Sequence, residues 1–232
     1  MRRGAPPPLP LDAASRAFSC DVRWRPHDLL KLRRLRLDEG EPSWVGEAFA
    51  RAPFAVVRRA LAAPGFIAVG VRGETRTQRY GAWAASADVE TAIAPEALTE
   101  VAPSCDRGAL PAFVVLAALC RSAATLNAFG WGPTGSVGFE LATGMPTATS
   151  TSDLDLLIRA PARLAREHAV VLLNELKAYA GETRVRIDAQ LETPAGGVAL
   201  MEFASGQPRI MARHSKGPQL VTDPWSAEGP DA

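Results

Sequence analysis

The sequence predicts an α+β protein in which a small β-rich N-terminal domain precedes a second domain that carries the candidate site. β-like runs separated by Pro-Gly and Gly-Glu turns recur in the first part of the chain, as expected for an antiparallel sheet. A long alanine-rich apolar stretch over residues 110–128 then predicts a helix. The third observation is the run Ser152–Ile158, in which apolar residues alternate with Asp153 and Asp155.

The composition is that of a globular protein and excludes several classes of partner. The chain has 232 residues, of which 47% are hydrophobic and 22% charged, so it has ample material for a core. A net charge of +1 leaves no broad basic footprint for nucleic acid. No apolar run reaches the roughly 20 residues of a membrane-spanning helix. Three cysteines without metal-binding spacing are typical of reduced thiols, so a cytoplasmic protein is expected.

The first expected domain covers residues 22–103 and follows a proline-rich stretch, residues 1–21, that is expected to be a disordered tail. After an initial turn the sequence predicts a helix, three strands and a second short helix, and residues 104–108 are expected to form the linker. In chain order these elements are expected at residues 43–52, 54–59, 66–72, 78–83 and 92–103.

The second expected domain covers residues 108–225 and is followed by a short tail over residues 226–232. It begins with the helix over 110–128 and continues with a glycine-rich turn and the Asp-x-Asp strand. A helix is then expected near residues 164–179, ending at Gly181 because glycine is common just after a helix. A strand over 184–191 and a hairpin that leads into a strand over 198–203 complete the expected elements.

Asp153 and Asp155 are the first candidate site residues. Side chains two positions apart on a strand point the same way, so both carboxylates project to one side. Two like charges that close repel each other unless a cation lies between them. Mg²⁺ prefers oxygen ligands and usually takes one or two carboxylates plus substrate phosphates. The sequence therefore predicts a magnesium site, and a solvated pair at a strand edge is the alternative.

The glycine-rich segment upstream of the aspartates is a candidate phosphate site. Gly135 and Ser136 lie in a turn whose backbone N–H groups are available to a phosphate. A glycine at this position permits close approach, because a Cβ atom would collide with the ligand. Ser136 is not expected to be a nucleophile, since no base lies at a motif spacing from it.

Asp188 is expected to be the third carboxylate of the site. It lies on the alternating run over residues 184–191, and Glu192 and Glu202 are alternatives for the same role. A Gly-Ser turn, an Asp-x-Asp strand and a later Asp-bearing strand, in this order, resemble the nucleotidyltransferase superfamily of polymerase-β type. That resemblance implies that Asp153, Asp155 and Asp188 are the catalytic and metal-binding residues.

Three longer segments are similar to one family. They are Arg25–Leu30, Trp131–Gly144 and Gly217–Trp225, and the similarity covers about residues 22–225. The family is that of malonate decarboxylase holo-acyl-carrier-protein synthases, also called phosphoribosyl-dephospho-CoA transferases. The resemblance implies transfer of a phosphoribosyl-dephospho-CoA group from its triphosphoribosyl precursor to a serine of the apo acyl carrier subunit of malonate decarboxylase, with release of pyrophosphate. A nucleotidyltransferase that uses ATP and a non-catalytic carrier-binding protein are the alternatives.

Four further residues are candidate contacts for such an anionic substrate. Arg58, Arg59 and Arg72 lie on or near expected strands, where arginines supply bidentate donors to phosphate or else form a solvated face. His27 is a candidate through the family resemblance, although it also lies in an expected turn. In the resembled family the nucleophilic serine belongs to the carrier, and Ser136 holds a phosphate.

Overall fold

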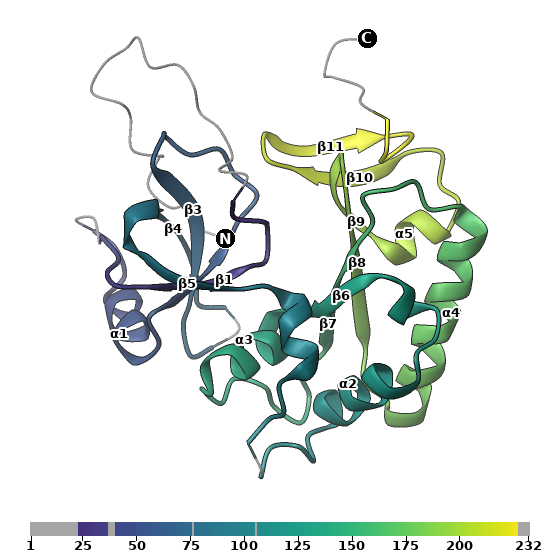
Figure 1. Ribbon diagram of the computed structural model, residues 1–232, viewed down its shortest axis with the longest axis horizontal. Helices are drawn as coiled ribbons and strands as arrows, with labels where there is room; N and C mark the ends of the chain where they lie inside the picture. Colours follow the sequence, from purple (N-terminus) through teal and green to yellow (C-terminus); the bar gives the residue numbers. More distant parts are fainter. Residues whose placement is uncertain (1–22, 37–39, 76, 105, 227–232) are drawn as a thin grey trace. The chain divides into compact units, whose positions relative to one another are not determined.

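The computed structural model describes residues 23–36, 40–75, 77–104 and 106–226. The chain forms two compact units, Met1–Ala94 and Pro95–Ala232, and each contains one sheet (Figure 1). The expected α+β class with an N-terminal and a C-terminal domain is therefore confirmed. The tail expected over residues 1–21, and all of the 226–232 tail except Ser226, lie outside the described residues.

The N-terminal unit is a five-stranded antiparallel sheet with strand order β4-β3-β2-β1-β5 and one helix. One face of the sheet is apolar and forms the core, and α1 packs on this face through Val45 and Ala48, which contact Val71. The elements are β1 Leu29–Leu32, α1 Ser43–Arg51, β2 Phe54–Val57, β3 Phe66–Arg72, β4 Arg79–Ala85 and β5 Val89–Ile93, with a 3-10 turn η1 at Ser86–Asp88. The core cluster contains Leu30, Leu32, Ala55, Val57, Ile67, Val69, Ala82 and Ala84.

Two strands of this unit were not expected from the sequence. β1 lies where only a turn was expected, and it is central to the sheet because it pairs with both β2 and β5. β5 ends at Ile93, inside the stretch 92–103 that was expected to carry a short helix. That stretch does contain a short helix, the 3-10 helix η2, Pro95–Glu100.

The division between the units lies at Ala94 and Pro95, before the linker expected at residues 104–108. The reason is the packing of η2 on β6 of the second unit. A Cβ atom at Gly132 would lie 1.9 Å from the backbone oxygen of Pro95, so only glycine permits this contact. Arg159 Nε also donates to Glu96 Oε1 at 2.9 Å, which ties η2 to the second sheet.

The C-terminal unit is a six-stranded sheet with order β11-β10-β9-β8-β7-β6, in which β7 and β8 are parallel and the other neighbours are antiparallel. Its strands are β6 Gly130–Pro133, β7 Leu154–Arg159, β8 Ile187–Thr193, β9 Gly196–Ala199, β10 Ile210–His214 and β11 Gly217–Val221. Its helices are η2, α2 Pro111–Ser122, η3 Leu126–Ala128, α3 Gly135–Thr143, α4 Arg166–Thr183 and α5 Leu200–Ala204.

Helices α2 and α4 end elsewhere than the sequence predicts. α2 begins with Pro111, a favoured first residue, but ends at Ser122. The carboxylate of Glu175 then accepts the backbone N–H groups of Thr125 and Leu126 at 3.0 and 2.9 Å, which starts the separate turn η3. α4 continues past Gly181 to Thr183, and Arg184 adopts the left-handed conformation with φ 58°.

The expected strand over residues 198–203 is also wrong after Ala199, because the chain turns into α5. Leu200 and Phe203 are both buried, and residues three apart lie on one side of a helix rather than of a strand. The Phe203 ring packs edge-on against Trp225, with ring centroids 5.2 Å apart. The pair β10 and β11, which the sequence analysis did not predict, completes the sheet.

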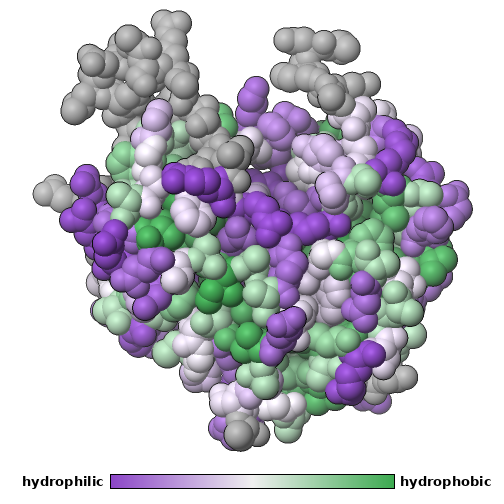
Figure 2. Space-filling model, in the orientation of Figure 1, coloured by the Kyte–Doolittle hydropathy of each residue, from purple (hydrophilic) through white to green (hydrophobic). Residues whose placement is uncertain are grey.

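The outer surface of α4 mixes hydrophilic and hydrophobic residues, as the right-hand side of Figure 2 shows. Val170 and Val171 are exposed there, whereas Ala169, Leu172 and Leu176 are buried. This is the pattern of an amphipathic helix that covers one face of a sheet. Among the residues that the structure describes, no helix combines the length and the apolar character needed to cross a membrane.

Candidate functional site

The strand pairing brings Asp155 and Asp188 together. α4 is the crossover between the parallel strands β7 and β8, and in their register Asp155 lies directly opposite Asp188. Neighbouring strands lie about 5 Å apart and opposite residues share a face, so the two carboxylates project side by side. Both residues are partly buried. Asp153, also partly buried, immediately precedes β7.

Gly135 and Ser136, which were predicted to lie in a turn, instead begin helix α3, and only Thr134 separates β6 from α3. This helix start lies against Asp155. The backbone N–H of Thr134 donates to the Asp155 carbonyl oxygen at 2.8 Å. Gly135 has φ 61°, and a Cβ atom there would lie 2.0 Å from Asp155 Oδ2. The glycine thus leaves room for the aspartate side chain, in addition to the phosphate for which the sequence predicts it. Ser136 is the second residue of α3.

Gly135→Ala is expected to lower activity strongly by displacing Asp155. The added methyl group cannot share its position with Asp155 Oδ2, and alanine also disfavours φ 61°. For a reaction in which Asp155 takes part, we expect a fall in kcat of about a hundredfold, since displacing a reacting group by about 1 Å has an effect of this size. Gly144→Ala is the matched control, because Gly144 also has positive φ but no atom lies within 4 Å of its added Cβ. Equal losses in the two variants would contradict the assigned role of Gly135.

Asp188 forms an ion pair with Arg186, which lies two positions before it in the sequence. Arg186 Nε donates to Asp188 Oδ1 at 3.0 Å, and a second guanidinium nitrogen lies 2.9 Å from the same oxygen. The Arg186 side chain is 67% exposed and the Asp188 side chain 39%. Among the described residues, no group of three or more His, Cys, Asp or Glu side chains is arranged to hold a metal ion by itself. Asp155 and Asp188 supply carboxylate oxygens, of which a Mg²⁺ site in a protein usually takes one or two.

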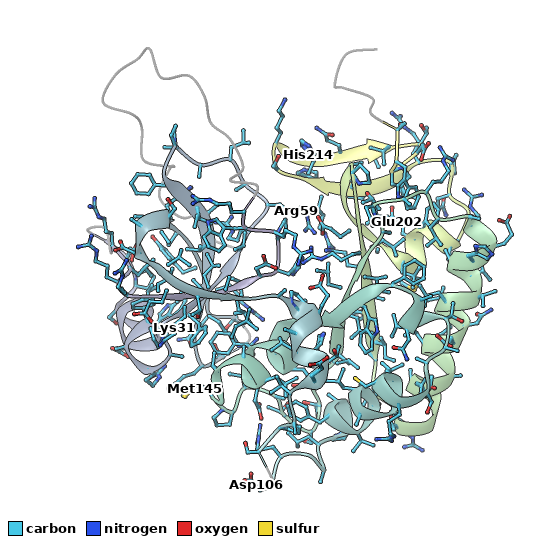
Figure 3. All side chains as sticks on the ribbon, viewed as in Figure 1. Lys31, Arg59, Asp106, Met145, Glu202 and His214 are labelled. Atoms are coloured by element: carbon cyan, nitrogen blue, oxygen red, sulfur yellow. The ribbon has the colours of Figure 1, made fainter. Side chains whose placement is uncertain are left out.

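The same sheet face continues from Asp188 to Gln190 and Arg213, neither of which was predicted as a site residue. Gln190 lies two positions after Asp188 on β8, and its Oε1 accepts a hydrogen bond from the Arg213 guanidinium at 2.7 Å. Arg213 lies on β10, a strand that was not predicted from the sequence. His214, at the turn between β10 and β11 (Figure 3), accepts the Lys216 backbone N–H on its Nδ1 atom at 3.2 Å.

A buried ion pair that the sequence did not suggest holds α3 in place. Glu140 is 4% exposed, and its carboxylate accepts two hydrogen bonds from Arg107, at 2.8 and 3.0 Å. It also accepts the backbone N–H groups of Thr147 and Ala148, both at 2.8 Å. Burial alone would raise the pKa of Glu140, but the hydrogen bonds from Arg107, Ala148 and Thr147 outweigh it and hold the pKa below its ordinary value.

In the N-terminal unit, the segment Arg25–Asp28 forms a tight turn that supports His27. Asp28 is buried, its backbone N–H donates to the Arg25 carbonyl, and its carboxylate accepts the Arg25 N–H at 2.9 Å. His27 has φ 73°, which is unusual for a residue with a side chain and suits the position after proline in such a turn. Arg59, labelled in Figure 3, places a guanidinium nitrogen 3.4 Å from His27 Nε2.

The other arginines predicted in this unit share one sheet face. Arg72, which is 8% exposed, lies directly opposite the exposed Arg79 on the neighbouring strand. Arg58, just after β2, is partly buried and lies over the same face. The structure therefore gathers Arg58, Arg72 and Arg79, and separately Arg59 with His27.

Comparison with protein families identifies the class of enzyme. Residues 25–95 match the model described as phosphoribosyl-dephospho-CoA transferase MdcG N-terminal domain, and residues 97–224 match the corresponding C-terminal domain. These matches define a transferase with the two-unit division seen in the structure. The chain belongs to the phosphoribosyl-dephospho-CoA transferase family.

Curated relatives agree with this assignment. A phosphoribosyl-dephospho-CoA transferase of Pseudomonas aeruginosa is 45% identical over 203 residues, which cover 86% of this chain and 93% of the relative. Proteins of the same name from Pseudomonas putida and Azotobacter vinelandii are 42% and 43% identical, and each alignment covers 87% of this chain and 95% or 94% of the relative. No solved structure gives a significant match.

Proposed function

We propose that the chain transfers a phosphoribosyl-dephospho-CoA group from triphosphoribosyl-dephospho-CoA to a serine hydroxyl of the apo acyl carrier subunit of malonate decarboxylase. Pyrophosphate is the second product. The observation that supports this most is the position of Asp155, which lies opposite Asp188 on parallel strands and against Gly135, in a chain of this family. The C-terminal unit would then be a nucleotidyltransferase domain of polymerase-β type.

In this proposal the serine oxygen of the carrier attacks the phosphorus of the triphosphate that is bonded to the ribose. A new P–O bond forms to the serine, the bond to the outer two phosphates breaks, and the serine proton leaves to a base. Asp188 lies beside Asp155 and is proposed to accept that proton. The Gly135-Ser136 segment is proposed to hold the departing pyrophosphate with backbone N–H groups and the Ser136 hydroxyl.

Asp153, Asp155 and Asp188 are the residues that would hold Mg²⁺ together with the substrate phosphates. When bound, the ion would neutralise the charge of the attacking and leaving oxygens. The side chains contribute position: Asp155 is set by the backbone bond from Thr134, and Asp188 by its place in the β7–β8 register. His27, Arg59 and Arg72 remain proposed contacts to the anionic substrate.

The proposal is tested by measuring pyrophosphate release with the purified chain, triphosphoribosyl-dephospho-CoA and apo carrier. We expect release that requires all three components and is abolished by EDTA and restored by Mg²⁺. Release with ATP in place of the precursor would instead favour a nucleotidyltransferase of different substrate. Binding of the carrier without any release, at saturating Mg²⁺, would contradict catalysis.

Ser136→Ala is expected to weaken the reaction without abolishing it. The variant loses one hydrogen bond to a charged phosphate, which is worth roughly 1.5–3 kcal/mol, or about ten- to a hundredfold in kcat/KM. The fold should not change, because the Ser136 carbonyl, which accepts the Thr147 hydroxyl, is retained. Steady-state kinetics measures the loss, and mass spectrometry of the quenched enzyme checks for covalent intermediates. A substrate adduct trapped on Ser136 would show that it is a nucleophile.

A further inference from the structure

The side chain of Arg58 packs against two glycines of neighbouring strands. Gly70 of β3 and Gly81 of β4 are directly opposite each other. A Cβ atom built on Gly81 would lie 2.1 Å from an Arg58 guanidinium nitrogen and 2.9 Å from its Cζ. One built on Gly70 would lie 3.4 Å from Cδ, an ordinary contact. Glycine weakens a strand interior, so a facing pair marks a place where another group approaches closely.

The Arg58 guanidinium is partly buried, and no carboxylate compensates its charge among the residues that the structure describes. Burial lowers the pKa of Arg58 below its ordinary value. Among the residues that the structure describes, the Arg58 side chain forms no hydrogen bond or ion pair. By contrast, Arg107 and Arg159 each face a carboxylate. A partly desolvated cation is unfavourable unless an anion compensates it, so the arrangement favours an anion from outside the described chain.

The surroundings of Arg58 fit an anionic ligand that also has an aromatic or polar part. Gly70 and Gly81 are each two positions from the next opposed pair, Arg72 and Arg79, so these arginines project from the same face. The two arginines therefore add guanidinium donors to the face on which Arg58 lies. On the other side of Gly81, Trp83 projects from this face, and its indole N–H is buried with no hydrogen-bond partner among the described residues.

We propose that the sheet face carrying Arg58 binds the diphosphate bridge of the dephospho-CoA part of the substrate. We call this the Arg58 site; it consists of Arg58, Arg72 and Arg79 over Gly70 and Gly81. This identification of the ligand rests on the proposed function. The reacting triphosphate is assigned to Asp155, Asp188 and the Gly135-Ser136 segment, so the diphosphate bridge is the anionic group of the substrate that still needs cations. Guanidinium groups recognise phosphate oxygens in pairs, which suits a diphosphate.

The two glycines supply a matched pair of variants that leave every charge in place. Gly81→Ala displaces the Arg58 guanidinium from its position over β4. The protein should still fold, because the displaced atoms are the far end of a flexible side chain. Gly70→Ala meets only the aliphatic stem of Arg58 at ordinary contact distance. Isothermal titration calorimetry of the full chain with dephospho-CoA is the measurement. We expect Kd to rise about tenfold or more in Gly81→Ala and in Arg58→Gln, and less than about threefold in Gly70→Ala.

Further ligands and variants separate the site from the proposed reaction. Pantetheine, which lacks the diphosphate, should bind weakly and equally to all variants, and Asp155→Ala should bind dephospho-CoA like the wild type. Arg51→Gln, which removes an exposed arginine paired with Glu74, controls for net charge. If inorganic pyrophosphate is sensitive to Gly81→Ala but dephospho-CoA does not bind, the anion site stands and its assignment to the substrate's bridge is overturned. Equal Kd values for dephospho-CoA and pyrophosphate in wild type, Gly81→Ala and Arg58→Gln would overturn the site itself, whatever the turnover.

Discussion

Replacing Asp155 with alanine is expected to reduce transfer about a thousandfold or more while leaving the fold intact. The residue is partly buried beside Asp188, so the variant loses a carboxylate at the point where the phosphates are proposed to bind. Asp153→Ala is expected to have a similar effect. The measurement is kcat for modification of apo carrier at saturating Mg²⁺, together with the circular dichroism spectrum of each variant.

Asp106→Asn is the control for this prediction, because Asp106 is an exposed carboxylate of the same unit (labelled in Figure 3). We expect its turnover to remain close to that of the wild type. Turnover of Asp155→Ala within tenfold of the wild type would show that neither metal binding nor substrate positioning depends on this residue.

Glu140→Ala is expected to destabilise the protein by about 2–4 kcal/mol. The change removes the acceptor of two backbone N–H groups and of two bonds from Arg107. The lower part of the range for a broken buried pair applies because Arg107 is 24% exposed and regains water. Urea denaturation measures the loss, and Glu167→Gln, an exposed residue of α4, is the control. A loss below 0.5 kcal/mol (roughly the surface level) would contradict a stabilising role.

The contribution of Glu140 is also expected to depend on pH. Its pKa is lowered in the folded state, so its stabilising effect is complete above the pKa of the unfolded chain, about 4.3. The effect is lost as the pH falls through the lower, folded-state pKa. The difference in unfolding free energy between wild type and Glu140→Gln should therefore shrink with acidification in this window. A difference that stays constant from neutral pH to below that pKa would contradict the shift.

The strands and helices with strong local signals were predictable, and those that depend on distant partners were not. α1 and β3 have the predicted bounds almost residue for residue, and for β3 the reason is that Pro-Gly and Gly-Glu turns bound its apolar run. β1 is only four residues long and acquires its strand conformation from pairing with β2 and β5 on both sides. α5 interrupts an expected strand because Phe203 packs against Trp225, which lies far away in the sequence.

The candidate site shows the same division. The proximity of Asp155 to Asp188 follows from an Asp-x-Asp strand, a helix and a second Asp-bearing strand, since that order gives a parallel pair. Gly135 was predicted only as a phosphate contact; the structure shows that a side chain there would also collide with the Asp155 carboxylate. Glu140 lies in an ordinary helical sequence, and only the folded chain brings Arg107 to it. Arg58 was predicted as a possible phosphate contact, but its packing over Gly70 and Gly81 depends on the register of β3 and β4 and could not be predicted.

The mass of the modified carrier tests the central claim most directly. Apo acyl carrier subunit of malonate decarboxylase is incubated with the purified chain, triphosphoribosyl-dephospho-CoA and Mg²⁺, and the intact carrier and its peptides are measured by mass spectrometry. The proposed function predicts that one serine gains the mass of a phosphoribosyl-dephospho-CoA group, in proportion to the pyrophosphate released, and that Asp155→Ala leaves the carrier unmodified. An unmodified carrier with the wild-type chain, or a carrier that gains only the mass of AMP when ATP is supplied, would contradict it.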